Sequence, residues 1–403
     1  MGESWRGPWE GNTVRCTNDR GRPRRLAILG STGSIGRQAL EVVRGLPGRF
    51  EVVGLAGGTN LELLRRQVVE FRPRYYSSVA PGDAPAGERV SLEEMASLPD
   101  VDLVLIATVG IAGLAPTLAA IRAGKPVALA NKEVLVVAGE VVAAEARRRG
   151  VPLLPVDSEH NAIWQCLRGE AALGSWDEAS SVARLILTAS GGAFRDYTPE
   201  QLARVTPAEA LRHPNWVMGP KVTVDSATLL NKGFEVIEAR WLFGVPYERI
   251  DVLMHRESVV HSLVQFVDGS IKAQLGPHDM RLPIQYALAY SDRAPGPAPA
   301  LDLASLGRLT FTPMDEARYP CFRLARQAAL AGRTYPAVLS GADESAVDLF
   351  LSGAIGFLDI ARLVEEVLSE HGPASDSTLD ELIRANDWAA TRCRELAARA
   401  RPA

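Results

Sequence analysis

The chain has 403 residues, of which 47% are hydrophobic and 23% charged, with a formal net charge of −4. This composition excludes a disordered chain, and the small negative charge gives no sign of a nucleic-acid-binding surface. The length suits two or three domains, and no apolar run is long enough to cross a membrane, so we expect neither a nucleic acid nor a membrane as partner.

The cysteines and the N-terminus indicate the compartment. Cys16, Cys166, Cys321 and Cys393 are far apart and include no Cys-x-x-Cys pair. They are typical of reduced thiols and favour a cytoplasmic protein over a disulfide-stabilised one. Residues 1–23 are rich in Gly, Arg and Trp and lack the apolar segment of a secretory signal. We interpret them as a disordered tail.

Residues 24–156 alternate short apolar runs with segments of helical spacing. Strands are predicted at 25–29, 50–55, 101–106 and 126–130, and helices at 35–43 and 61–71. Repeated strand–helix units of this kind predict an α/β fold, with an N-terminal Rossmann-like parallel sheet that binds a dinucleotide.

The pattern changes in residues 157–290, which we expect to form a central α+β catalytic domain. Strands are predicted at 183–187, 221–224, 251–254, 259–267 and 270–275, the last two joined by the turn signal Asp268-Gly269. The Pro-rich stretch 292–300 marks a linker, placed at 291–315. Helical spacing at 320–331, 342–351, 357–370 and 378–400 then predicts a C-terminal helical domain over 316–403.

A glycine-rich turn follows the first predicted strand. It reads Gly30-Ser-Thr-Gly33-Ser-Ile-Gly36 and opens a helix. Glycine lets the backbone approach a pyrophosphate there, and the helix N-terminus offers free N–H groups to it. The position of the turn in the first strand–helix unit predicts a dinucleotide site.

The end of the second predicted strand bears on the choice of cofactor. It reads Ala56-Gly-Gly-Thr-Asn60 and contains no acid that would repel a 2′-phosphate, so NADP(H) is permitted. Arg65 and Arg66 lie on the next helix. They either reach that phosphate or are solvated helix charges.

Carboxylates cluster at a second strand-to-helix turn, Asp157-Ser158-Glu159-His160. Two carboxylates so close repel each other unless a cation lies between them, and hard oxygen ligands suit Mg²⁺ or Mn²⁺ better than zinc. Helix capping is the alternative, because Asp, Ser and Glu are all favoured at a first turn. His160 is either a ligand or a structural residue.

A further polar segment runs from Asp225 to Glu238 and is interpreted as a strand-to-helix junction. Helical spacing places Asn231, Lys232, Glu235 and Glu238 near one face. This face either holds a phosphate and a metal or carries an ordinary Lys232–Glu235 surface pair.

Three other segments are candidates for ligand contacts. Ser190-Gly-Gly192 is either an anion-binding nest or a plain turn. The loop 213–220, which contains Trp216, is predicted to be a lid. Lys132 follows a strand of the first domain, on the edge where parallel sheets bind ligands, and is either catalytic or a solvated helix start.

Taken in order, these segments resemble the 1-deoxy-D-xylulose 5-phosphate reductoisomerase family of the non-mevalonate isoprenoid pathway. The resemblance covers essentially the whole chain after about Arg24. It rests on eight motifs: Gly30-Ser-Thr-Gly-Ser-Ile-Gly36, Ala130-Asn-Lys-Glu133, Leu154-Pro-Val-Asp-Ser-Glu-His-Asn161, Ser190-Gly-Gly192, Arg212-His-Pro-Asn-Trp216, Val224-Asp-Ser-Ala-Thr228, Asn231-Lys-Gly-Phe-Glu235 and Asp279-Met-Arg281.

The resemblance implies an NADPH-dependent oxidoreductase that uses Mn²⁺ or Mg²⁺, with Co²⁺ as a further candidate. Its substrate would be the small phosphorylated sugar 1-deoxy-D-xylulose 5-phosphate, which is rearranged and reduced to 2-C-methyl-D-erythritol 4-phosphate. It also implies a homodimer.

The resemblance further implies a role for each matching residue. The metal ligands would be Asp157, Glu159 and Glu235, and the catalytic residues Lys132, Glu159 and Glu238. The substrate contacts would be Ser158, Ser190, His213, Trp216, Ser226, Asn231 and Lys232. The cofactor contacts would be Thr32, Gly33, Ser34, Ile35, Gly57, Asn60, Asn131, Glu133, Gly219 and Met280.

Two departures from the family pattern stand out. Thr59 lies where some members have a Lys beside the 2′-phosphate, so NADPH preference would then depend on Arg65 or Arg66. Where many members read Asn-Ala-Ala-Asn-Glu, this chain reads Ser340-Gly-Ala-Asp-Glu344, a change that the sequence does not explain.

Two alternative functions stay open on the residues alone. A metal-independent sugar or semialdehyde dehydrogenase would explain the glycine turn and Lys132, but it leaves Asp157, Glu159 and Glu235 without a joint task. A nucleotide-sensing protein without turnover would have little need for so many polar groups in one cleft.

Overall fold

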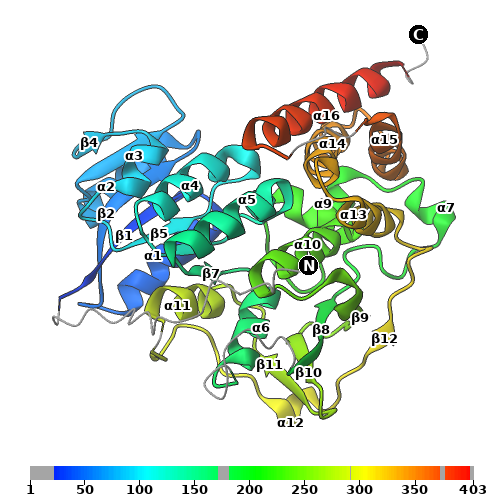
Figure 1. Cartoon of the computed structure of the whole chain (residues 1–403), viewed down its shortest axis with the longest axis horizontal. Helices are drawn as coiled ribbons and strands as arrows, with labels where there is room; N and C mark the ends of the chain where they lie inside the picture. The colour runs from blue at the N-terminus through cyan, green and yellow to red at the C-terminus, as the bar shows by residue number, and fades with distance from the viewer. Residues whose placement is uncertain (1–21, 171–180, 291, 373–376, 400–403) are drawn as a thin grey trace.

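The computed structural model describes residues 22–170, 181–290, 292–372 and 377–399. Most of the predicted N-terminal tail therefore lies outside the described residues. Three parts follow one another along the chain: a parallel sheet with its helices, a mixed sheet with its helices, and a group of C-terminal helices (Figure 1).

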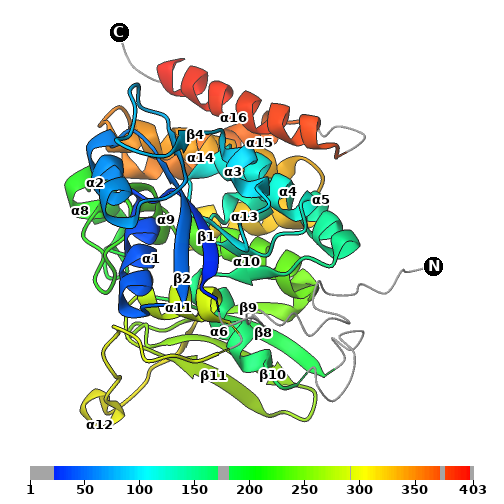
Figure 2. The same ribbon diagram turned by 90° about the vertical axis from the view of Figure 1, so that its left-hand side faces the viewer.

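The first part is a seven-stranded sheet of order β4-β3-β2-β1-β5-β6-β7, in which every pair is parallel. Its central strands are buried along most of their length because helices cover both faces, with α1 on one side of β1 and β2 and α4 and α5 on the other (Figure 2). The predicted Rossmann-like sheet is confirmed. Its strands are β1 Arg24–Leu29, β2 Phe50–Gly57, β3 Tyr75–Ser78, β4 Glu88–Arg89, β5 Leu103–Ile106, β6 Val127–Leu129 and β7 Leu153–Pro155. Its helices are α1 Ser34–Gly45, α2 Leu61–Phe71, α3 Leu92–Ser97, η1 Gly110–Gly113, α4 Leu114–Arg122 and α5 Glu133–Arg149.

The glycine turn is packed too tightly for a side chain. A methyl group at Gly36 would lie 2.2 Å from the carbonyl oxygen of Gly30 and 2.5 Å from the Cα of Ser31. Both neighbours are backbone atoms, which cannot rotate away. The turn and the start of α1 therefore depend on glycine at this position.

Gly36→Ala is expected to destabilise the protein by about 1–3 kcal/mol, the usual cost of overpacking. Urea unfolding followed by circular dichroism measures the change. Gly45→Ala is the matched control, since Gly45 ends the same helix and has nothing within 4 Å of its added methyl group. Equal unfolding midpoints for the two variants would contradict the packing argument.

The second part is a mixed sheet of order β11-β10-β8-β9-β12, in which only β8 and β9 are parallel. Helices α6, Ser158–Leu167, and α10, Leu230–Phe243, pack against it. The strands are β8 Val182–Ala189, β9 Ile250–Met254, β10 Val260–Phe266, β11 Ile271–Leu275 and β12 Thr312–Pro313. The predicted hairpin between β10 and β11 is confirmed. β12 lies inside the segment predicted as a linker, so the end of that segment is a strand of this sheet.

The predicted strand at 221–224 is wrong. These residues lie in α9, Pro220–Thr228, which starts with Pro at its first turn after the N-cap Gly219. The segment after it is accordingly a helix-to-helix junction, not a strand-to-helix one. The junction turns at Leu229, a buried residue with φ of 57°, and α10 begins directly after it.

The third part is a group of helices, as predicted. Helix α14 contacts the other three and also reaches α5 of the first part and α9 of the second. The red α16 lies along this group in Figures 1 and 2. The helices are α13 Pro320–Ala331, α14 Tyr335–Leu351, α15 Phe357–Glu370 and α16 Leu379–Arg399. The remaining elements are α7 Pro199–Leu202, α8 Pro207–Ala210, η3 Tyr247–Arg249, α11 Arg281–Ala289, which packs on α1, and α12 Leu303–Leu306.

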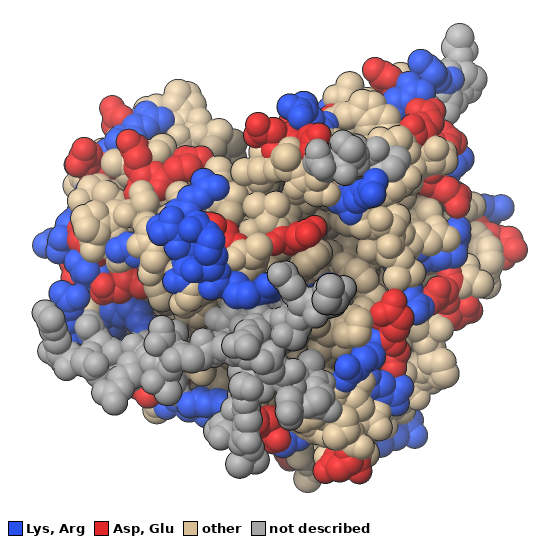
Figure 3. Space-filling view, in the orientation of Figure 1, with Lys and Arg blue, Asp and Glu red and all other residues tan. Residues whose placement is uncertain are grey.

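Acidic and basic side chains are interspersed over the face of the molecule in Figure 3. Among the described residues, no helix has both the length and the apolar character that crossing a membrane requires.

Candidate active site

A cavity lies between the first and second parts, around α9 and α10. It receives residues from the start of α1, the ends of β6, β7 and β8, the loop 213–219, and helices α9, α10 and α11. The carboxyl ends of parallel strands β1, β6 and β7 open toward it, as expected for ligand sites in α/β proteins.

Most of the predicted site residues line this cavity. They are Ser34, Ile35, Lys132, Asp157, Ser158, Glu159, Ser190, His213, Trp216, Gly219, Ser226, Asn231, Lys232, Glu235 and Met280. Those that do not line it are Thr32, Gly33, Gly57, Asn60, Asn131, Glu133 and Glu238.

Three carboxylates converge in the cavity. Asp157, Glu159 and Glu235 each offer an oxygen, and these oxygens lie within 4.8 Å of one another. Asp157 is the N-cap of α6 but its side chain makes no capping hydrogen bond, which disfavours the capping alternative. Three hard oxygen donors at this spacing fit Mg²⁺ or Mn²⁺.

Two lysines lie between these carboxylates. Lys132 Nζ lies 2.6 Å from Asp157 Oδ2 and 3.5 Å from Glu235 Oε1. Lys232 Nζ lies 2.8 Å from Glu159 Oε1 and also pairs with Glu235. The Lys232 side chain is 4% exposed, so the ordinary surface pair proposed as an alternative is wrong.

Burial and charge act in opposite directions on two of these acids. Burial favours the neutral form of Asp157, but Lys132 and its other neighbours outweigh it and lower the pKa. Burial, with Glu159 as the next cause, raises the pKa of Glu235 to about 8 despite the two lysines. The negative charge of Glu235 is thus poorly compensated, which suits a site that takes up a further cation.

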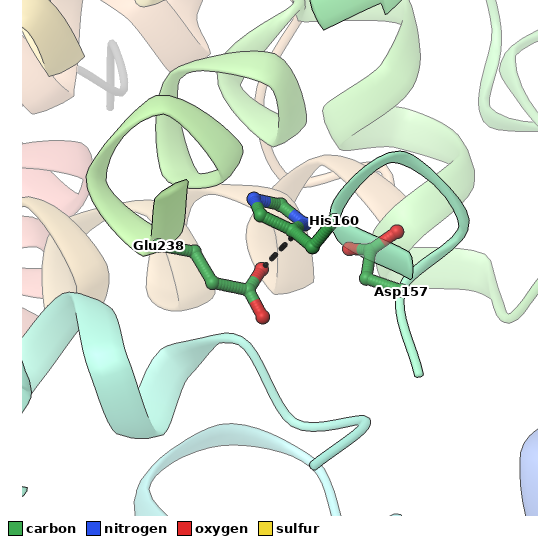
Figure 4. Close-up of side chains that lie close together, drawn as sticks. All are labelled: Asp157, His160 and Glu238. Atoms are coloured by element: carbon green, nitrogen blue, oxygen red, sulfur yellow. Dashed lines mark ion pairs between the residues drawn. The ribbon is translucent and has the colours of Figure 1, made fainter. Parts of the chain in front are cut away.

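Glu238 and His160 lie close to Asp157 and to each other, as Figure 4 shows. His160 Nδ1 lies 3.4 Å from Glu238 Oε2, and its Nε2 lies 2.8 Å from the backbone oxygen of Glu235. Burial lowers the pKa of His160 to about 4 and raises that of Glu238. With Asp157 they offer an alternative set of ligand atoms, but neither residue lines the cavity, which supports a structural role for His160.

The other end of the cavity carries neutral donors. Ser190 Oγ lies 2.9 Å from His213 Nε2 and accepts a hydrogen bond from the N–H of Gly192 at 3.2 Å. His213 Nδ1 accepts from the N–H groups of Asn215 and Trp216, so its proton is on Nε2. Burial lowers the pKa of His213 to about 4.

Gly192 brings this turn against α9. Its φ is 69°, and a methyl group there would lie 2.4 Å from the Ser226 carbonyl oxygen. The glycine turn and the Ser226 backbone are therefore in direct contact, and Ser190 and Ser226 both line the cavity. Such an end, with hydroxyls, a His and Lys232 nearby, suits a phosphate.

The loop 213–219 borders the cavity with apolar side chains. Trp216 packs on the ring of His261 with 5.8 Å between centroids and on His278 at 5.4 Å. Val217 lines the cavity and is 95% exposed. An exposed apolar residue beside a polar cavity is consistent with the predicted lid.

The nucleotide end is built from the carboxyl ends of β1 and β2. Gly33, the N-cap of α1, gives no side-chain cap, so the first N–H groups of α1 have no side-chain partner. The N–H of Gly58 donates to Thr32 Oγ1 at 3.4 Å, which joins the two strand ends. Asn60 caps α2 by accepting from Leu63. These features fit a pyrophosphate and an adjacent ribose.

Polar side chains around the nucleotide end form hydrogen bonds or ion pairs with other residues of the protein. Arg65 Nε donates to the backbone oxygen of Asp83 at 2.9 Å, and Arg66 pairs with Glu62. Asn131 Nδ2 donates to the backbone oxygens of Thr108 and Gly110, both at 2.9 Å, and so fixes the ends of β5 and β6.

The sequence did not identify some cavity residues. His261 lies on β10 and Ser258 in the turn before it, and both line the cavity with Met218 and Val222. A His among the apolar residues Val260, Leu263 and Val264 of one strand was the available signal for His261. Ser258 carries no such signal, since its position depends on the fold of the loop.

Three family models match the chain. The model described as 1-deoxy-D-xylulose 5-phosphate reductoisomerase matches residues 26–139, and its C-terminal domain matches residues 153–243. The model described as the DXP reductoisomerase C-terminal domain matches residues 275–392.

Relatives and solved structures agree with these matches. Two 1-deoxy-D-xylulose 5-phosphate reductoisomerases are similar over most of their length. That of Pelotomaculum thermopropionicum is 51% identical over 90% of this chain and 96% of its own. That of Geobacillus kaustophilus is 54% identical over 89% and 95%. A crystal structure of DOX-P reductoisomerase with NADPH, fosmidomycin and magnesium is 38% identical, with a TM-score of 0.87 over 93% of this chain and 98% of that one. The Zymomonas mobilis enzyme with NADPH is 39% identical, with a TM-score of 0.84 over 93% and 99%.

Proposed function

The chain belongs to the 1-deoxy-D-xylulose 5-phosphate reductoisomerase family, and from this we infer that it converts 1-deoxy-D-xylulose 5-phosphate to 2-C-methyl-D-erythritol 4-phosphate. The reaction rearranges the carbon skeleton and then reduces the resulting aldehyde with NADPH, with a divalent cation bound. The observation that carries this function is the convergence of three carboxylates, two lysines and the polar side chains of Ser190, His213 and Ser226 in one cavity.

Asp157, Glu159 and Glu235 would hold the cation. When bound, Mg²⁺ or Mn²⁺ supplies a Lewis acid that stabilises negative charge on neighbouring substrate oxygens. Ser158 lines the cavity beside the carboxylates and its hydroxyl donates to Glu159 Oε2 at 2.5 Å. Its hydroxyl is then placed to contact the same end of the substrate.

Ser190, His213, Ser226, Asn231 and Lys232 would bind the substrate phosphate and tail. The His213 Nε2–H and the Lys232 ammonium supply donors, and the serine hydroxyls can both donate and accept. A phosphate held away from the reacting carbons gives binding energy that orients them. Trp216 and Val217 border the same space and would exclude water when the substrate is bound.

Lys132 is the residue best placed to act on the reacting end. Its Nζ lies 2.6 Å from both Asp157 Oδ2 and Asn231 Oδ1, and the residue lines the cavity. The surrounding acids raise its pKa despite burial, so it is a cation at neutral pH. It would donate hydrogen bonds to substrate oxygens. Glu238 does not line the cavity. It would act indirectly, through the electrostatic interaction of its carboxyl group with Lys132 and Asp157.

The residues at the ends of β1, β2 and β6 would hold NADPH, whose hydride reduces the aldehyde. The free N–H groups of Ser34 and Ile35 would bind the pyrophosphate, with Thr32 and Gly33 in the same turn. Gly57 and Asn60 lie at the end of β2, where the adenosine ribose would bind. Asn131, Glu133, Gly219 and Met280 would lie near the nicotinamide half.

The function is tested by NADPH oxidation with purified protein and 1-deoxy-D-xylulose 5-phosphate, with and without Mn²⁺. Oxidation that requires both substrate and metal supports the proposal. Oxidation that persists after EDTA treatment would favour the metal-independent dehydrogenase. Cofactor binding without any oxidation would favour the sensor.

Thr59→Lys is expected to raise the preference for NADPH over NADH by about 2–5-fold. Arg65 and Arg66 already have partners, so an added ammonium at the exposed end of β2 would strengthen contact with a 2′-phosphate by the modest amount typical of exposed ion pairs. The measurement is the ratio of kcat/KM for the two cofactors. Arg66→Lys is a control that keeps the charge on α2, and an unchanged ratio for Thr59→Lys would place the 2′-phosphate elsewhere.

The family resemblance and the composition also support a cytoplasmic homodimer. Cys166, Cys321 and Cys393 are buried and unbonded, which suits a reducing compartment. β11 is an edge strand whose Ile271 is 51% exposed, and Val267 before it is 67% exposed, so an apolar surface is available for a second copy. Light scattering after gel filtration tests the dimer.

A further inference from the structure

A second charge cluster lies outside the cavity, where α9 meets α5 and α14. Lys221 Nζ lies 2.7 Å from Asp225 Oδ2, 2.7 Å from Asp343 Oδ2 and 3.6 Å from Glu133 Oε1. Asp225 is 2% exposed and Asp343 is 0% exposed. The cluster therefore joins the first part of the chain through α5, the second through α9 and the third through α14.

The cluster contains more carboxyl groups than ammonium groups. One ammonium faces two buried carboxylates at contact distance, and Asp225 Oδ1 and Asp343 Oδ1 are buried with no hydrogen-bond partner among the described residues. Burial, with Asp225 as the next cause, raises the pKa of Asp343 to about 8. Asp343 belongs to Ser340-Gly-Ala-Asp-Glu344, the segment that departs from the family pattern. Burying carboxyl oxygens without hydrogen-bond partners costs free energy, so we expect this arrangement to serve a function.

The position of the cluster on α9 indicates what that function is. Lys221 and Asp225 are one helical turn apart and neither lines the cavity, whereas Val222 and Ser226, the next residue after each, both do. The cluster thus holds one side of α9 while the adjacent side faces the substrate. On α5, Glu133 likewise follows Lys132, which lines the cavity.

We propose that Lys221, Asp225 and Asp343 form a positioning cluster, through which the C-terminal helices fix α9 against α5 and so set the affinity of the cavity for its phosphorylated substrate. The substrate named here rests on the proposed function. None of the three residues touches the cavity, so they act through Ser226 and Lys132.

Lys221→Met tests the cluster by removing its cation. The unbalanced carboxylates are expected to displace α9 and with it Ser226, and to raise KM for 1-deoxy-D-xylulose 5-phosphate about tenfold or more, while kcat changes less than about threefold. Lys272→Met is the matched control, since Lys272 is an exposed lysine on β11 that pairs with Glu170. An unchanged KM in Lys221→Met, with or without lower thermal stability, would reduce the cluster to a structural role and overturn the proposal.

Asp343→Asn gives a second test that keeps the shape of the side chain. Asp343 is neutral below the raised pKa and becomes charged as pH rises through about 8, which adds repulsion beside Asp225. KM of the wild type is therefore expected to rise more steeply between pH 7 and 9.5 than KM of Asp343→Asn, since any titration within the cavity is common to both proteins. The substrate phosphate titrates near pH 6 and does not interfere in this range. The same pH dependence in both proteins would overturn the proposal.

The titratable groups that face Asp343 and Asp225 are Lys221, Glu133, Lys132, Glu344 and Cys321.

Hydrogen exchange separates this proposal from the proposed function. Peptides covering residues 219–229 are expected to exchange faster in Lys221→Met than in wild type, and at the wild-type rate in Lys272→Met. This readout needs no turnover. If wild type fails to oxidise NADPH with this substrate, the function is wrong and the exchange still tests the cluster. Unchanged exchange in Lys221→Met would overturn the cluster itself.

Discussion

Glu235→Gln is expected to lower the metal-dependent turnover on the order of 100-fold or more, while NADPH affinity stays within about twofold. Changes to groups that only support a metal ligand typically cost about 10–100-fold, and Glu235 would be a ligand itself. Its side chain is 1% exposed and accepts from Asn231 Nδ2 at 2.5 Å, so the amide fits the same space but cannot carry the charge. The Glu235 carboxylate bonds to Lys132, Asn231 and Lys232, and none of these is a proposed cofactor contact.

The measurement is kcat at saturating substrate with Mn²⁺ titrated, together with NADPH binding followed by fluorescence. Glu248→Gln is the control, because Glu248 is an exposed acid just after α10. If Glu235→Gln keeps more than about a tenth of wild-type turnover, with the same Mn²⁺ dependence, the metal assignment is wrong.

Lys132→Met is expected to lower kcat about 100- to 1000-fold without weakening the binding of Mn²⁺. Lys132 lines the cavity and its ammonium contacts Asp157 and Glu235, and loss of one such donor commonly costs this much. Lys132 and a divalent cation both interact with Asp157 and Glu235 oxygens. Removing the lysine therefore removes a competitor for the metal, whereas Glu235→Gln removes a ligand.

The two variants form a matched pair for Mn²⁺ binding by calorimetry. Weaker binding in Glu235→Gln but not in Lys132→Met is the expected contrast. Lys125→Met serves as control, since Lys125 donates to the Val101 oxygen at the opposite end of the parallel sheet. Equal losses of Mn²⁺ affinity in both site variants would show that Lys132 only maintains the shape of the site.

The parallel sheet was predictable because its signals are local. The first two apolar runs are each followed by a helix with a clear polar face, and the glycine turn lies at a fixed place in the first unit. The C-terminal helices were predictable for the same reason. α9 was not, because six consecutive residues from Thr223 to Thr228 are buried and no face is left to show a helical period. Its β-branched Val and Thr residues then favoured a strand. The i,i+4 pair of Lys221 and Asp225 was the overlooked helix signal.

The site was predictable in its composition more than in its geometry. Spacing brought Asp157 and Glu159 together, but their convergence with Glu235 depends on how α6 and α10 pack. Lys132 lies between Asp157 and Glu235 only because the first and second parts of the chain are in contact. The change to Asp343 had no explanation in the sequence, because its partners Lys221 and Asp225 are more than 100 positions away. The domain boundaries stay predictions, and β12 suggests that the linker ends earlier than residue 315.

The pairing of β12 with β9 is expected to hold the two parts of the protein together after a break in the chain between them. Residues 292–311 run over the surface, and β12 then pairs with β9 before the C-terminal helices begin. α14 also packs on α5 and α9. A protease that cuts near Ala298 would leave two fragments whose contacts do not depend on the broken peptide bond. Such a nicked enzyme would migrate as two pieces in denaturing gels yet stay whole, and active, in solution.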